Sequence, residues 1–122
     1  MPNAKKTLVL GASLKEERYS NMAIRNLRRH NQPVVAVGLR EGEVGDVHIG
    51  KDLPEGLRVD TVTMYLNAHN QEAWRERILA MKPKRIIFNP GAENPAFERA
   101  AQEAGIETLE ACTLVMLNTG QY

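Results

Sequence analysis

The sequence predicts an α/β fold, specifically a Rossmann-like doubly wound parallel sheet with three layers, α/β/α. Short apolar runs rich in branched residues alternate with polar or amphipathic segments of helical length along the whole chain. Such alternation is typical of parallel strands joined by crossover helices that cover both faces of a sheet. The chain has 122 residues, which suits one domain, and we expect residues 1–122 to form it.

Strands are expected where a short apolar run is followed by glycine, proline or small polar residues. These runs are residues 7–13, 34–37, 59–66, 84–88 and 106–109. The stretch 40–58 carries several glycines and a proline between charged residues. It therefore predicts a loop with at most one short strand, at residues 47–49.

Helices are expected in the segments between these runs. They are residues 20–30, 71–81 and 94–105, with a final helical turn at 114–117. Ser20 and Asn94 are candidate N-caps, and Asn94 is followed by a proline that suits the first helical turn. In the second helix Trp74, Ile78 and Met81 recur at helical spacing.

Composition and charge exclude several classes of protein. Sixteen basic and fifteen acidic side chains leave a net charge of +1, so we expect no nucleic-acid partner, which would favour a clear basic excess. No apolar run approaches the roughly 20 residues of a membrane span, and we expect neither a membrane partner nor a signal peptide. The single cysteine, Cys112, precludes an internal disulfide, so a cytoplasmic location is expected.

The common catalytic motifs are missing from the sequence. It has no Cys/His cluster of the metal-binding type and no Gly-x-Ser-x-Gly nucleophile motif. We therefore expect no catalytic residues and no metal ligands.

Candidate ligand-binding residues lie where the predicted strands end. In open α/β sheets, ligands bind beyond the carboxyl ends of the strands, near the point where the strand order reverses. The candidate cofactor-binding residues at these ends are Gly11, Ala12, Ser13, Gly38, Arg40, Tyr65, Leu66, Asn67, Asn89, Pro90 and Gly91, with Ser20 and Asn21 at the following helix start.

The turn at residues 11–13 is a candidate phosphate site. Its small residues would let the main chain approach a phosphate, and the amides near Ser20 and Asn21 favour an anion. The dinucleotide pattern Gly-x-Gly-x-x-Gly is missing, because only Gly11 is present. In the alternative interpretation the turn only reverses the chain and Ser20 only caps a helix.

Arg40 follows the second predicted strand, where an NAD-binding sheet usually has an acidic residue. Arginine suits a phosphate, either the 2′-phosphate of NADP or the 3′-phosphate of coenzyme A (CoA). Glu41 is the next residue, so NAD is not excluded. An arginine in a solvated loop is the alternative.

The remaining candidates also have structural alternatives. Tyr65 and Asn67 could contact an adenine or pantetheine group, although Tyr65 suits a rim position equally well. Cys112 follows the last predicted strand, and no histidine lies near it in the sequence. A lone cysteine is more often a small buried filler than a nucleophile.

Six segments of the sequence resemble the family of small, stand-alone CoA-binding domains. They are residues 9–13, 18–21, 34–38, 59–62, 83–88 and 110–113. These domains are similar in fold to the CoA-binding N-terminal domain of the succinyl-CoA synthetase alpha subunit. The resemblance covers nearly the whole chain.

The resemblance implies that CoA binds across the strand ends. By this resemblance, residues 11–13 and 20–21 would line the phosphates, and Gly38 and Arg40 would flank the 3′-phosphate. Residues 65–67 would border the nucleotide. Residues 89–91 would face the pantetheine arm, with Cys112 nearby. The sequence departs from the synthetase pattern in lacking a second glycine after Gly11 and a proline after the second strand. The catalytic histidine of the synthetase lies in a second domain, so the resemblance implies no phosphoryl-transfer or ligase chemistry here.

Three functions are compatible with the sequence. The leading hypothesis is non-catalytic binding of CoA or an acyl-CoA, as a sensor, carrier or accessory module. The alternative is an NAD(P)-binding redox sensor or small oxidoreductase, since Arg40 fits NADP almost as well. The third is a structural or interaction domain with a vestigial crevice. The expected partner is a small-molecule nucleotide cofactor, and no protein partner is indicated.

Overall fold

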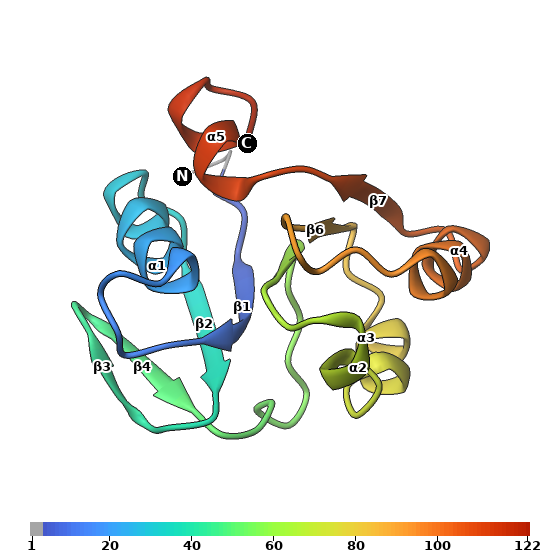
Figure 1. The fold of residues 1–122 in the computed structure, drawn as a ribbon, viewed down its shortest axis with the longest axis horizontal. Coiled ribbons are helices and arrows are strands. Elements are labelled where there is room, and N and C mark those ends of the chain that lie inside the picture. The colour runs from blue at the N-terminus through green and yellow to red at the C-terminus, as the bar shows by residue number, and fades with distance from the viewer. Residues whose placement is uncertain (1–3) are drawn as a thin grey trace.

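The computed structural model describes residues 4–122, which build one seven-stranded sheet in the order β3-β4-β2-β1-β5-β6-β7 (Figure 1). The strands are β1 (Thr7–Ala12), β2 (Val34–Gly38), β3 (Gly42–Val44), β4 (Val47–Gly50), β5 (Thr61–Met64), β6 (Arg85–Phe88) and β7 (Glu107–Glu110). Every pairing is parallel except that of β3 with β4. From β1 the chain builds outward through β2 and β4, and then through β5, β6 and β7 on the other side. The order therefore reverses between β1 and β5, and the expected Rossmann-like α/β fold is confirmed.

Helices cover both faces of this sheet. They are α1 (Tyr19–Arg29), α2 (Ala68–Gln71), α3 (Arg75–Met81), α4 (Pro95–Glu103) and α5 (Thr113–Asn118). Ile24 and Leu27 of α1 share an apolar cluster with Leu117 of α5. Ile78 of α3 and Phe97 of α4 belong to the cluster on the other face. In Figure 1, α1 and α5 accordingly lie apart from α2, α3 and α4.

The two faces of the central strands differ in polarity. Leu8, Leu10, Val62, Met64, Ile86 and Phe88 alternate along β1, β5 and β6 and fill the core under α3 and α4. On the α5 side, the same strands and the residue after β6 bury polar side chains. We call this set the polar strip: Thr7, Thr61, Thr63, Arg85 and Asn89.

The expectation for residues 40–58 was incomplete, because this stretch contains two strands. β3 and β4 form an antiparallel hairpin, with Val44 opposite Val47 and both side chains buried. Gly45 adopts a positive φ of 59° in the turn between them, which glycine allows at little cost. The guanidinium of Arg28 donates to both carboxylate oxygens of Asp46 and ties the hairpin to α1.

Two expectations about helices were wrong. Ser20 does not cap α1: Arg18 occupies the N-cap position and makes no side-chain capping bond, while Ser20 lies buried inside the first turn. The helix expected over residues 71–81 begins only at Arg75 as α3, because residues 72–74 form a turn between it and α2. Asn94, in contrast, caps α4 as expected, accepting from the amide of Phe97. Within residues 4–122 no helix is both long enough and apolar enough to cross a membrane.

Candidate functional site

The predicted strand ends meet along a single edge of the sheet. Ala12 pairs with Gly38, while Leu10 pairs with Met64 and Met64 with Phe88. Because these pairings are parallel, the carboxyl ends of β1, β2, β5 and β6 face the same side. We call this side the carboxyl edge.

Gly11 and Gly38 allow the main chains at this edge to approach closely. Gly11 has a φ of +93°, and a Cβ placed on it would lie 3.1 Å from the main chain of Tyr65 and Leu66. A Cβ on Gly38 would lie only 2.1 Å from the carbonyl oxygen of Ala12. Both glycines are therefore required by packing between strand ends, whether or not a phosphate approaches them.

The loop between β1 and α1 is held by side chains of the helix. Asn21 donates from Nδ2 to the carbonyl oxygen of Ser13 (2.9 Å) and accepts from Arg25 Nε at Oδ1 (2.8 Å). Arg25 also donates from Nη2 to the carbonyl oxygen of Glu16 (2.9 Å). The side chain of Asn21 thus shapes the loop. Sequence reasoning missed the part of Arg25, for which its i,i+4 spacing from Asn21 was the available signal.

The start of α1 remains open to an anion. The amides of Tyr19, Ser20 and Asn21 donate to no acceptor in residues 4–122, and the first turn carries no acidic residue. Unpaired N–H groups and the positive end of the helix dipole both favour negative charge at such a place. This first turn follows directly on the loop that leaves β1.

Arg40 lies in the exposed connection between β2 and β3. It forms neither an ion pair nor a hydrogen bond with any residue of the described chain. Its neighbour Leu39 is 91% exposed. The guanidinium is therefore available to an external anion.

In the segment after β5, two side chains hold the local structure and one hydroxyl has no partner. Asn67 caps α2, with Oδ1 accepting from the amide of Asn70 (2.9 Å). Leu66 packs against the apolar cluster under α3. Tyr65 is half-buried; burial raises the pKa of its phenol, and its hydroxyl has no hydrogen-bond partner among the described residues.

Asn89 is a buried tie between three elements. Its Nδ2 donates to Thr63 Oγ1 (2.8 Å) and to the carbonyl oxygen of Met64 (2.9 Å), and its Oδ1 accepts from the amide of Thr113 (2.9 Å). Pro90 and Gly91 are exposed beside it. Asn89 therefore has little hydrogen-bonding capacity left for a ligand.

A second buried network, which the sequence analysis did not anticipate, holds the neighbouring loops. Gln71 donates from Nε2 to the carbonyl oxygens of Leu66 (2.9 Å) and Ala92 (2.7 Å). Asn94 donates from Nδ2 to Gln71 Oε1 (2.9 Å). These bonds join the loops after β5 and β6 and coincide with the break between α2 and α3. Hydrogen bonds over such separations in sequence leave no local pattern.

The carboxyl edge is negatively charged near the end of β7. The neighbouring Glu98 carboxylate raises the pKa of Glu110, and Glu93 adds to this effect. Cys112 is half-buried just before α5. No group of three His, Cys, Asp or Glu residues in the described chain is arranged to hold a metal ion.

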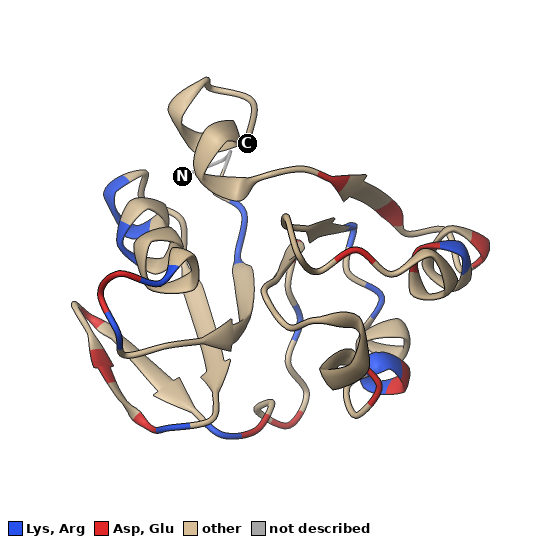
Figure 2. Cartoon of the chain, in the orientation of Figure 1, with Lys and Arg blue, Asp and Glu red and all other residues tan. Residues whose placement is uncertain are grey.

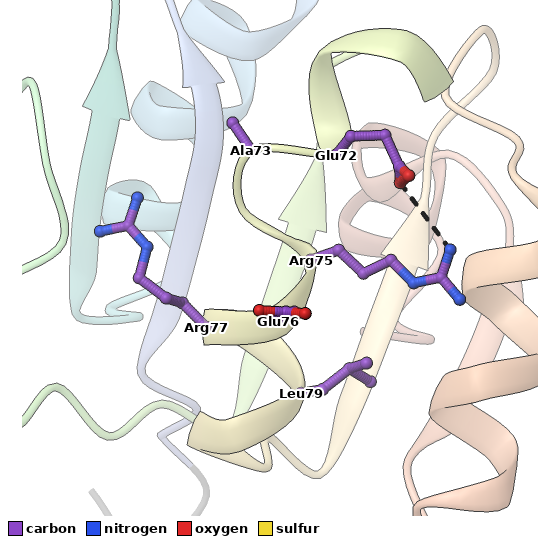
Figure 3. Close-up of a pocket in the computed structure, with 6 residues that line it drawn as sticks. All are labelled: Glu72, Ala73, Arg75, Glu76, Arg77 and Leu79. Carbon is purple, nitrogen blue, oxygen red and sulfur yellow. Dashed lines mark ion pairs between the residues drawn. The ribbon is translucent and has the colours of Figure 1, made fainter.

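The groove in Figure 3 lies on α3 and the turn before it. Glu72, Arg75 and Arg77 are among its lining residues, and none of the candidate cofactor residues lines it. Arg75 faces Glu72 at 3.7 Å, while Arg77 points away and pairs with Asp52 at 2.6 Å. Both arginines of this groove are therefore already paired with carboxylates.

Comparisons with known proteins agree with the fold. A family model described as a CoA binding domain matches residues 5–118. The crystal structure of an uncharacterized protein is 44% identical, with 98% of each chain covered and a TM-score of 0.93. A protein from Thermus thermophilus, cell-free ID.343, is 24% identical over 99% of this chain and 92% of its own, with a TM-score of 0.83.

A more distant likeness is to an acetyl-coenzyme A synthetase from Ca. Korarchaeum cryptofilum. It is 14% identical over 85% of this chain and 25% of its own, with a TM-score of 0.70. No curated protein matches the chain.

Proposed function

Because the chain belongs to the CoA-binding domain family, we propose that it binds coenzyme A or an acyl-CoA at the carboxyl edge of its sheet. The role would be that of a sensor, carrier or accessory module, without a reaction of its own. The observation that carries the location is the open start of α1, where the amides of Tyr19, Ser20 and Asn21 have no acceptor within the described chain. A diphosphate would accept from these main-chain donors.

The geometry refines which residues would contact the cofactor. Arg40, which is exposed and unpaired within the described chain, would take the adenosine 3′-phosphate. Asn21, Asn67 and Asn89 would act indirectly, because their side chains hold the surrounding loops. Pro90, Gly91 and Cys112 would lie toward the pantetheine arm, following the family resemblance.

A ligand panel tests the proposal. CoA at about 100 times its Kd should add roughly 2.7 kcal/mol to the free energy of unfolding. For a chain of this length the melting temperature should rise on the order of 5–15 °C. NADPH, which also carries a ribose phosphate, is the matched control and should give no shift. A shift with NADPH and none with CoA would overturn the proposal.

The Arg40→Ala variant tests the contact with the 3′-phosphate. It should weaken CoA about tenfold or more, the loss expected for a hydrogen bond to a charged group, and leave dephospho-CoA nearly unaffected. Arg58→Ala is the control, because Arg58 is exposed shortly before the amino end of β5. Titration calorimetry would measure the affinities of the unmodified sequence and of both variants for CoA and for dephospho-CoA. Equal weakening of CoA and dephospho-CoA would remove the assignment.

A further inference from the structure

The segment after β7 is fastened by polar contacts at both of its ends. At the carboxyl edge, Thr113 donates its amide to Asn89 and shares a hydrogen bond between hydroxyls with Thr63 (2.7 Å). At the opposite edge, the hydroxyls of Tyr122 and Thr7 are hydrogen-bonded to each other.

The Tyr122 end is held by two cations in addition. Arg85 donates from Nη2 to the main-chain oxygen of Tyr122 (2.9 Å), and Lys5 donates from Nζ to the same oxygen. The guanidinium of Arg85 also lies 4.4 Å from the centre of the Tyr122 ring. In Figure 1 the segment runs from the end of β7 into α5 and then loops back to end near the start of β1.

Apolar contacts with α1 accompany these bonds, because Leu117 lies in the cluster of Ile24 and Leu27, against which Tyr122 also packs. Met116 and Leu117 are the buried apolar side chains of α5, while Val115 is 56% exposed. Beneath the segment lies the polar strip, whose hydroxyl, amide and guanidinium groups are readily hydrated. Lifting the segment would exchange protein hydrogen bonds for bonds to water and would expose Met116, Leu117 and the Tyr122 ring. The apolar cluster under α3 and α4 contains no residue of the segment and would stay buried, so opening costs less than unfolding of the whole chain.

We propose that residues 112–122 form a strap that opens as a unit while the sheet stays folded. Opening removes the cover from the polar strip and exposes the Tyr65 hydroxyl, which is buried without a partner in the described chain. It also brings the half-buried thiol of Cys112 fully into solvent. The strap therefore controls the access of reagents to that thiol.

Hydrogen exchange followed by mass spectrometry tests the strap. Amides of residues 113–121 should exchange about tenfold or more faster than those of β1 and β5, as expected for local opening. Their exchange should change little in urea concentrations below the unfolding transition, because local opening exposes little surface. Exchange of the strap at the rate and with the urea dependence of β1 would overturn the proposal, and this measurement needs no variant.

Tyr122→Ala should release one end of the strap. Alkylation of Cys112, the single cysteine, by N-ethylmaleimide should become about tenfold faster, while exchange in β1 and β5 stays unchanged. Tyr19→Ala is the matched control, because Tyr19 is 70% exposed. In this control variant Cys112 should be alkylated at the same rate as in the unmodified sequence. Thr63→Val loosens the other end and should act in the same direction. An unchanged alkylation rate in both strap variants, with the sheet intact, would contradict the proposal.

Discussion

Single glycines decide how closely the strands meet at the carboxyl edge. Gly38 leaves room for the carbonyl oxygen of Ala12, which a Cβ would approach to 2.1 Å. That atom belongs to the backbone of the central strand β1, so it cannot rotate away as a side chain would. A methyl group at this position must displace a strand.

Gly38→Ala should therefore destabilise the protein by about 3 kcal/mol, the upper part of the range for overpacking. Gly50→Ala is the matched control within β4, because its Cβ would come no closer than 3.9 Å to any atom outside its chain neighbours. The control should change stability by less than about 1 kcal/mol. Urea unfolding would measure both. Equal midpoints for the two variants would show that the strand ends move apart without cost.

The asparagines show what the sequence can and cannot predict about a site. Their positions at strand ends placed Asn67 and Asn89 correctly along the carboxyl edge. Their partners, however, are amides and hydroxyls that the fold brings close, such as Thr63 and Thr113 for Asn89. Sequence alone cannot separate a side chain that binds a ligand from one that binds the next loop.

At the scale of elements, the sequence predicted long or fully apolar segments and missed short mixed ones. The strands β1, β2 and β6 each contain a run of at least three apolar residues and were predicted from that pattern. β3 was missed because it has three residues and its central residue, Glu43, is exposed. The break between α2 and α3 was missed because Gln71, which fits a helix locally, is drawn into bonds with Leu66 and Ala92.

His48 in the β3–β4 hairpin should make the stability of the protein depend on pH. The hydrogen bond with Glu43 raises the pKa of His48, and Glu41 contributes in the same direction. Protonated His48 therefore stabilises the hairpin below the unfolded value of about 6.5, and this contribution is lost as the pH rises through the folded value. NMR titration should give His48 a pKa above 6.5, and Glu43→Gln should lower it. A His48 pKa at or below about 6.5 would refute the interaction with Glu43.

At the scale of the whole molecule, alternating apolar runs were sufficient to predict the fold class. The reversal of strand order then placed the candidate site at one edge before any contact was known. The polar strip was the main surprise in the core. Thr61 and Thr63 signalled it within an otherwise apolar strand, but Arg85 resembled a surface residue until its bonds to Thr61 and Tyr122 were seen.

Binding of CoA should leave a footprint confined to one edge of the molecule. Hydrogen exchange should slow at residues 13–21 and 38–41, because main-chain donors and the loop of Arg40 would become ordered by the ligand. The groove on α3 in Figure 3, residues 72–79, should not change. Dephospho-CoA should protect residues 13–21 but not 38–41. Protection centred on residues 72–79 would move the site to that groove.

The two outermost strands also influence how separate molecules meet. β7 begins with Glu107 and ends with Glu110, both exposed, while β3 at the other border carries the exposed Glu43. Figure 2 shows acidic positions along both strands. If the outermost strands of two copies lay side by side, their carboxylates would be brought together and would lose water of hydration. This repulsion opposes growth of the sheet from one molecule into the next, so the unpaired backbone of its borders is a poor template for aggregation.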